Sequence, residues 1–329
     1  MAVYKRLILA SSLLLAIMLS ACGTTLTSTS TGAGPSASLS YTDATGTTVT
    51  LPRPPTRIAC LVGICEDILA SLGMQPVAVN DTLGQDPHFF GDAAKKFAVI
   101  GGQFNNPNVE DIAKARPDLI IGLANAHEQL RDALRPIAPL YIMNPIRYTD
   151  SIAYLKDIGR LTGRTAQADA AAQVFLNKLA AYESKSPKTK SAVLLYGSDV
   201  NFNVFTTSSL PGSLLSEVTP YAWPIPGKGG APSSDHEPGA TAGSLEELLA
   251  RNPDAIFIAS FTFAPGAQPI STQLAHNPVW SHLSAVQQHQ VFEVRPDLYI
   301  FGRGTISLGL MLDDAMTKLY PDVFPQPLT

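Results

Sequence analysis

The sequence contains two copies of one short pattern, far apart in the chain. Residues 109–121 hold an acidic start, a Pro-Asp pair and an apolar run, and residues 245–257 repeat this order 136 positions later. In each copy a helix has to end before the proline, because proline pushes the preceding residue out of the α region. The apolar run shows no polar alternation, which is typical of a strand buried on both faces of a parallel sheet. Two such units predict two similar α/β lobes with a cleft between them.

Alternating strands and helices surround each copy. The first lobe is predicted to hold a hairpin at 41–51, strands at 57–62, 76–79 and 140–143, and helices at 66–72 and 128–135. The second is predicted to hold strands at 192–196, 202–205 and 291–294, a long loop at 224–243 and a helix at 305–319. This alternation indicates a doubly wound, Rossmann-like α/β fold in each lobe.

A long helix is predicted between the lobes. Residues 165–184 place apolar side chains at steps of three and four, and twenty helical residues span about 30 Å, the width of a small domain. A shorter helix is expected at 151–161. We therefore expect a first lobe at 41–148, a helical linker at 149–186 and a second lobe at 187–329.

The N-terminus is predicted to be a targeting segment. Lys5 and Arg6 precede an apolar stretch at 7–18 that is too short for a membrane span. The ending Leu-Ser-Ala-Cys resembles a bacterial lipobox, which predicts a signal peptide at 1–21 and lipidation of Cys22. The alternative is an ordinary secretory leader with an unrelated cysteine. Residues 22–40 consist largely of Thr, Ser, Gly, Ala and Pro, so we expect a flexible tether.

Two cysteines, Cys60 and Cys65, remain after the leader. Oxidising conditions outside the cytoplasm allow a disulfide between them, and two buried small apolar residues are the alternative.

The net charge of −4 and the absence of Lys and Arg clusters give no sign of a nucleic-acid partner. No nucleophile elbow, zinc-protease helix or phosphate loop appears, so the chain is not expected to be an enzyme. A surface adhesion lipoprotein is a further reading.

From residue 41 onward the sequence resembles the periplasmic-binding-protein family that serves ABC importers of iron-siderophores, cobalamin and haem. The resemblance depends on an ordered set of motifs, at 43–46, 55–58, 66–69, 161–164, 302–307 and 312–314, together with the two copies. The segment from Gly302 to Ser307 is most similar to ferric-siderophore and ferric-citrate members.

The resemblance implies two lobes joined by a single stiff helix, with the ligand held between them and a modest hinge motion on closure. It implies a lipid-anchored carrier on the outer side of the bacterial cytoplasmic membrane, in the cell envelope or periplasm. The expected ligand is an iron(III)-siderophore complex, and no intrinsic cofactor is expected. Haem or cobalamin is the alternative, and a bare metal ion is a weaker one.

The family docks on its permease dimer through one exposed glutamate in each lobe. Glu110 and Glu246 match those positions, inside the two copies. The alternative is that each is an acidic residue favoured at a helix start by the macrodipole. Their neighbours Asp111 and Glu247 fit either role. We expect neither glutamate to touch the cleft.

Ligands in open α/β sheets lie beyond the carboxyl ends of the strands. The loops in question are 63–65, 82–90, 101–108, 123–128, 144–149, 197–210, 222–237, 260–269 and 295–304. Ferric siderophores are bulky and often anionic, so arginine and aromatic side chains are the useful types. The candidate ligand-binding residues are Arg147, Tyr148, Trp223, Tyr299 and Arg303, and further wall residues are Phe89, Phe261 and Phe263.

Histidines raise the question of a metal site. His88, His127 and His236 fall in candidate loops, without the tight spacing of a ligand set. Ferric-citrate members often show an Arg-His pair where this chain has Ala126 and His127. A carboxylate clamp in the first lobe would then depend on Arg147.

Overall fold

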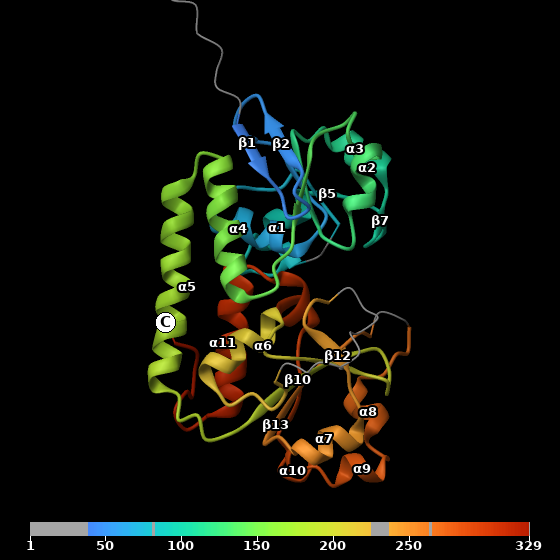
Figure 1. Ribbon diagram of the computed structural model, residues 1–329, viewed down its shortest axis with the longest axis vertical. Helices are drawn as coiled ribbons and strands as arrows, with labels where there is room; N and C mark the ends of the chain where they lie inside the picture. The colour runs from blue at the N-terminus through green and yellow to red at the C-terminus, as the bar shows by residue number, and fades with distance from the viewer. Residues whose placement is uncertain (1–38, 81–82, 225–236, 263–264, 329) are drawn as a thin grey trace, which may run out of the picture. The chain divides into compact units, whose positions relative to one another are not determined.

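Two five-stranded sheets form the framework of the protein (Figure 1). The computed structural model describes residues 39–80, 83–224, 237–262 and 265–328. In the first lobe the strands run in the order β5-β4-β3-β8-β9, and all neighbours are parallel. These strands are β3 (Ile58–Cys60), β4 (Ala78–Val79), β5 (Ala98–Val99), β8 (Leu119–Leu123) and β9 (Leu140–Met143).

The sheet of the second lobe is mixed. Its order is β12-β11-β10-β13-β14, and only the β10-β13-β14 part is parallel. The strands are β10 (Ala192–Gly197), β11 (Asn203–Phe205), β12 (Ala240–Ala242), β13 (Ala255–Ser260) and β14 (Val291–Glu293). The doubly wound pattern predicted for both lobes is therefore complete only in the first. The connection at 198–202 is too short for the crossover that a parallel neighbour needs, so β11 returns antiparallel.

Helices cover both sheets. They are α1 (Gly63–Ser71), α2 (Val109–Ala115), α3 (Arg131–Leu134), α4 (Tyr148–Leu161), α5 (Thr165–Lys185), α6 (Leu210–Val218), α7 (Leu245–Arg251), α8 (Ile270–Leu274), α9 (Pro278–Ser281), α10 (Ser284–Gln287) and α11 (Thr305–Leu319). Short helical turns are η1 (Leu83–Gln85), η2 (Gly91–Lys96), η3 (Glu128–Leu130) and the π-helical η4 (Asp297–Gly302). Two antiparallel hairpins complete the fold: β1 (Leu39–Thr42) with β2 (Thr48–Leu51), and β6 (Gly102–Gln103) with β7 (Asn106–Pro107).

Helix α5 runs alongside both lobes (Figure 1). Its first half buries Ala168 and Ala172 in the core of the first lobe. Its second half buries Phe175, Leu179 and Tyr182 in the core of the second lobe. The apolar side chains at steps of three and four therefore serve two different cores, as expected for a bridging helix. Strand β1 begins at Leu39, within the stretch expected to be a tether, and β12 lies within the expected long loop.

The two repeated units have the same local structure. Helices α2 and α7 are seven residues long, and each begins at a side-chain cap, Asn108 or Ser244. Each helix is followed by a residue in the left-handed region, Arg116 or Asn252, which lets the chain turn into the proline.

The aspartate of each Pro-Asp pair has a matching partner. Asp118 accepts a hydrogen bond from the backbone N–H of Arg57, at 2.8 Å, and Asp254 accepts one from that of Ser191, at 2.7 Å. Each aspartate therefore joins the entry of one central parallel strand to the entry of its neighbour. This contact explains why the pair recurs in both lobes.

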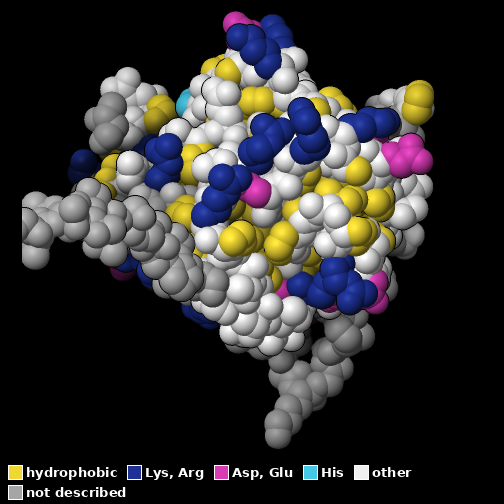
Figure 2. Space-filling view, turned by 90° about the horizontal axis from the view of Figure 1, so that it is seen from above, with side chains coloured by type: hydrophobic (Ala, Val, Ile, Leu, Met, Phe, Trp, Pro, Cys, Tyr) yellow, Lys and Arg dark blue, Asp and Glu magenta, His cyan; other side chains and the backbone are white. Residues whose placement is uncertain are grey.

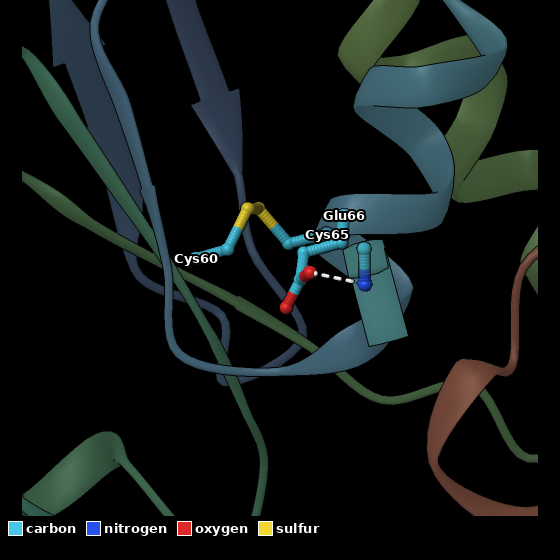
Figure 3. The surroundings of a disulfide bond; sticks show 4 residues. Cys60, Cys65 and Glu66 are labelled. Atoms are coloured by element: carbon cyan, nitrogen blue, oxygen red, sulfur yellow. Dashed lines mark hydrogen bonds between the residues drawn. A yellow bond between two sulfur atoms is a disulfide. The ribbon is translucent and has the colours of Figure 1, made fainter. Parts of the chain in front are cut away.

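A disulfide joins Cys60, the last residue of β3, to Cys65 in the first turn of α1 (Figure 3). Both cysteines are fully buried. The two alternatives that the sequence leaves open are thereby resolved in favour of the disulfide. Next to it, the carboxylate of Glu66 accepts a hydrogen bond from the backbone N–H of Gly84, at 2.8 Å.

Seen from above, over the first lobe, Lys and Arg side chains lie in several separate groups and do not form one continuous patch (Figure 2). In the part of the chain that the structure describes, no helix combines the length and the apolarity needed to cross a membrane.

Candidate functional site

A cavity of about 850 Å³ lies at the carboxyl edge of the second-lobe sheet. Its walls come from the segments that follow β10, β12 and β13, where ligands collect in open α/β sheets. Phe104, in the turn between β6 and β7 of the first lobe, closes one side. The lining residues are Phe104, 196–203, Glu237, 242–246, Phe261 and Phe301. Five of the expected loops contribute, and the segment at 242–246 was not among them.

Aromatic rings form much of the wall. The rings of Tyr196 and Phe261 are 5.9 Å apart between centroids, and those of Phe261 and Phe301 stack at 5.6 Å. Phe301 belongs to η4, where the π-helical turn widens the helix, a feature frequent at functional sites. Phe261 was expected to line a wall, and it does.

His127 holds the turn that carries Phe104. Its Nδ1 accepts a hydrogen bond from the backbone N–H of Leu123, at 3.0 Å, so the proton of the neutral ring is on Nε2. Nε2 then donates to the carbonyl oxygen of Phe104, at 2.7 Å. The histidine is fully buried, and this burial lowers its pKa, although the Phe104 carbonyl and the Glu128 carboxylate act in the opposite direction. His127 therefore positions Phe104 as a neutral ring.

Three carboxylates line the cavity: Asp199, Glu237 and Glu246. Glu246 is exposed at the start of α7, and its side chain forms part of the cavity rim. The expectation that neither docking glutamate touches the cleft is therefore wrong for Glu246. Glu110 is exposed on α2 and does not line the cavity.

Arg303 and Tyr299 are buried behind the cavity wall and do not line it. The Nε of Arg303 donates to the carbonyl oxygen of Ile300, at 2.7 Å, and its Nη2 forms an ion pair with Glu237. The hydroxyl of Tyr299 donates to Asp314, at 2.8 Å, and burial raises its pKa well above the ordinary value. Both side chains thus have partners inside the protein.

The other three candidate residues also lie away from the cavity. Trp223 is buried in the core of the second lobe, with the Arg251 guanidinium 4.5 Å from its ring centroid. Arg147 is exposed at the start of α4, and the Tyr148 hydroxyl donates to Glu217, at 3.2 Å. The segment at 222–237 reaches the cavity through Glu237, whereas the segment at 144–149 does not line it, and the expectation that these three side chains face the cavity is not met.

Two further aromatic positions were expected in the walls. Phe89 packs against the core of the second lobe and does not line the cavity. Phe263 lies outside the described residues.

The segment from Gly302 to Ser307 instead joins the two lobes. The carboxylate of Asp67, in α1, accepts hydrogen bonds from the backbone N–H of Ile306 at 3.1 Å and from the N–H and hydroxyl of Ser307 at 2.7 and 2.6 Å. It therefore caps the start of α11. A Cβ at Gly304 would lie 2.2 Å from Cγ of Asp67, so this close approach needs glycine.

The cavity residues that the sequence does not single out are mainly Tyr196, Phe202, Phe301 and Phe104. The first two flank the turn directly after β10, and the position just beyond a central parallel strand is the signal that points to them. Phe104 depends on a contact with His127, which nothing in the local sequence reveals.

The described part of the chain brings no three His, Cys, Asp or Glu side chains together as a possible metal site. His88 pairs with Asp86 through Nδ1, at 2.7 Å, and the fully buried His127 is fixed by its own two bonds. His236 lies outside the described residues.

Known proteins are similar to this chain over most of its length. YhfQ of Bacillus subtilis, provisionally named an ABC transporter substrate-binding lipoprotein, is 26% identical over 325 residues, 96% of this chain and 98% of that protein. The Fe(3+) dicitrate-binding periplasmic protein FecB of Escherichia coli is 26% identical over 293 residues, 86% and 89% of the two chains. The crystal structure of the triscatecholate siderophore-binding protein FeuA of Bacillus subtilis has a TM-score of 0.67 at 21% identity, covering 85% and 98%.

The fold found here agrees with that structure, with parallel sheets, covering helices and two lobes. The model of the periplasmic binding protein family matches residues 58–298. This range includes both repeated units, the bridging helix and all the lining residues of the cavity except Phe301. The family is a substrate-binding type and not a class of enzymes. The chain belongs to the periplasmic binding protein family.

Proposed function

We propose that this protein is an extracytoplasmic solute-binding lipoprotein that captures a ferric siderophore and delivers it to an ABC importer. The observation that carries the proposal is the cavity of about 850 Å³, walled by aromatic and polar side chains of the second lobe and closed by Phe104 of the first. Its size is in the range of small-molecule sites, and its lining offers flat apolar faces with a few polar groups. The names of relatives, which include a ferric-citrate and a ferric-siderophore binder, support the same ligand class.

Delivery would occur through the exposed acidic residues that begin α2 and α7. Asp111 is held by Lys114 at 3.0 Å, and Glu247 by Arg251 at 2.8 Å. Within the described residues, Glu110 and Glu246 form no hydrogen bond or ion pair through their side chains. They are therefore the members of each pair that are available to arginines of a permease dimer.

A thermal-unfolding screen tests the ligand class. The purified protein is heated with ferric siderophores of several chemical types, with haem, with cobalamin and with free metal ions. A ligand present at a hundredfold over its dissociation constant should stabilise the fold by about 2.7 kcal/mol. Stabilisation by haem or cobalamin alone, or by none of these compounds, would refute the proposed function. Recovery of the ligand unchanged after binding distinguishes a carrier from an enzyme.

A further inference from the structure

The charge of the cavity is negative. Among the lining residues that the structure describes, the charged side chains are Asp199, Glu237 and Glu246, and all three are acidic. No described lysine or arginine reaches the lining. Exposed carboxylates that face a shared space repel an anion and attract a cation, and the effect grows as water is excluded.

Glu237 engages Arg303, an arginine that does not line the cavity. It forms an ion pair with Arg303, whose side chain is only 6% exposed. Arg303 also donates to the Ile300 carbonyl, at 2.7 Å. An anionic ligand could reach this guanidinium only by displacing Glu237, and breaking an ion pair with so deeply buried an arginine is unfavourable. The arginine is thus neutralised by the protein itself.

Asp199 and Glu246 keep their charge facing the cavity. The Asp199 carboxylate accepts a hydrogen bond from the backbone N–H of Asn201, at 2.7 Å, which fixes the turn after β10. Glu246, at the start of α7, also lines the cavity and is exposed. Within the described residues neither carboxylate forms an ion pair.

The aromatic side chains of the wall also favour a cationic or neutral ligand over an anionic one. Ring faces carry negative charge density and attract cations, and they also bury apolar surface. Phe301 and Phe261, whose rings stack on each other, line the same cavity as the carboxylates. Two independent features of the lining therefore favour a ligand without net negative charge.

We propose that this cavity selects ferric complexes by charge, accepting neutral or cationic trihydroxamates and rejecting anionic citrate and catecholate complexes, with Asp199 and Glu246 as specificity-determining residues. The proposal rests on the proposed function. Each hydroxamate carries a single negative charge, so three of them neutralise one ferric ion. Catecholates and citrate bring more negative charge than iron can offset, and their complexes remain anionic.

The test compares one pair of ligands that differ mainly in charge, and two anionic complexes of other shapes. Ferrioxamine B, a ferric trihydroxamate with a free ammonium group, is compared with its N-acetylated form, which is neutral, and with ferric citrate and ferric enterobactin. Affinities are measured by calorimetry at low and high salt. We expect the cationic complex to bind more tightly than the neutral one, the preference to shrink at high salt, and the anionic complexes to bind at least about tenfold more weakly.

The double variant Asp199→Asn, Glu246→Gln should reduce the preference for the ammonium form over the acetylated form by about tenfold. Glu247→Gln is the matched control, because Glu247 is the next residue on α7 and does not line the cavity. Both variants change exposed side chains, and thermal unfolding confirms that they fold.

Two outcomes of this test distinguish a failure of the charge rule from a failure of the proposed function. If ferric citrate or enterobactin binds as tightly as the neutral trihydroxamate, or if the double variant changes no preference, the charge rule is overturned while ferric-siderophore binding stands. If no ferric complex of any charge binds, the proposed function fails, and the charge rule fails with it.

Discussion

Asp67 is a buried carboxylate whose ionisation affects the stability of the whole protein. Burial raises its pKa to about 6, against the hydrogen bonds that it accepts from Ile306 and Ser307. A group whose pKa is raised on folding stabilises the fold fully below its unfolded pKa, and this contribution is lost as the pH rises through the folded value.

We therefore expect the free energy of unfolding of the wild type, relative to Asp67→Asn, to fall by up to about 3 kcal/mol between pH 4 and pH 7. Denaturant unfolding at several pH values measures this difference. Asp322→Asn, at an exposed position, should show no such trend. A constant difference between wild type and Asp67→Asn would mean that the carboxylate is not buried as described.

The pH dependence of stability that we expect from His127 is opposite in sign to that of Asp67. Its pKa is lowered by burial, so its contribution is present above the unfolded pKa and is lost as the pH falls through the folded value. His127→Ala should cost about 1–3 kcal/mol at pH 7.5, because two buried hydrogen bonds are lost, and less at pH 5. Unfolding of this variant is compared with that of His276→Ala, which changes an exposed histidine. Equal losses at both pH values would contradict the neutral, buried ring.

The ends of the strands indicated several of the loops that line the cavity, but none of the five candidate ligand-binding side chains is among the lining residues. Arg303 and Tyr299 were chosen as types that bind anionic ligands, yet each is used internally, by Glu237 and by Asp314. Whether a polar side chain faces a cavity or a partner depends on contacts that are distant in sequence. The sequence pattern does not contain this information.

At the scale of elements, the disulfide between β3 and α1 closes a short loop. Replacing Cys60 and Cys65 together by alanine should lower the free energy of unfolding by about 2 kcal/mol, through the loss of the loop constraint. Guanidinium unfolding with and without reductant measures the effect. Reductant should destabilise the wild type and leave the variant unchanged. Reaction of an alkylating reagent with these cysteines in unreduced, unfolded protein would contradict the assignment.

Elements with strong patterns were predicted well from sequence. The bridging helix was expected at 165–184 and is α5 (Thr165–Lys185), and the last helix was expected at 305–319 and is α11 (Thr305–Leu319). Strand β12 was missed because it is short and lies in a segment rich in Gly and Pro, where it forms by pairing with β11. Pairing with β11 stabilises an extended conformation that the local sequence does not favour by itself.

At the scale of the whole molecule, a variant at Glu110 distinguishes docking on the permease from binding of the ligand. It lies on α2, away from the cavity, whereas Glu246 takes part in the rim. Glu110→Ala should abolish most ligand uptake by cells and leave the affinity of the purified protein unchanged. Asp132→Ala, at another exposed acidic position of the first lobe, is the control. Normal uptake with Glu110→Ala would remove this residue from the docking surface.

Anchoring is tested at Cys22, which lies outside the described residues. Cys22→Ser should give a protein that is not lipidated and is either released from the cell or retained by its uncleaved leader. Metabolic labelling with a fatty acid and fractionation of the cells report both outcomes. Label that still attaches to the variant would refute the lipobox.

The contact between Asp67 and the start of α11 also has a consequence for the order in which the protein can form. A ribosome produces Asp67 early, but the amides that bind it belong to residues 306 and 307, close to the end of the chain. Until those residues have been synthesised, Asp67 lacks these hydrogen-bond donors and α1 lacks the helix that packs against it. A nascent chain that stalls before residue 306 is therefore incomplete in both lobes at once. Synthesis of residues 306 and 307, and not of the segments of the first lobe alone, is therefore needed before the contacts of α1 can be complete.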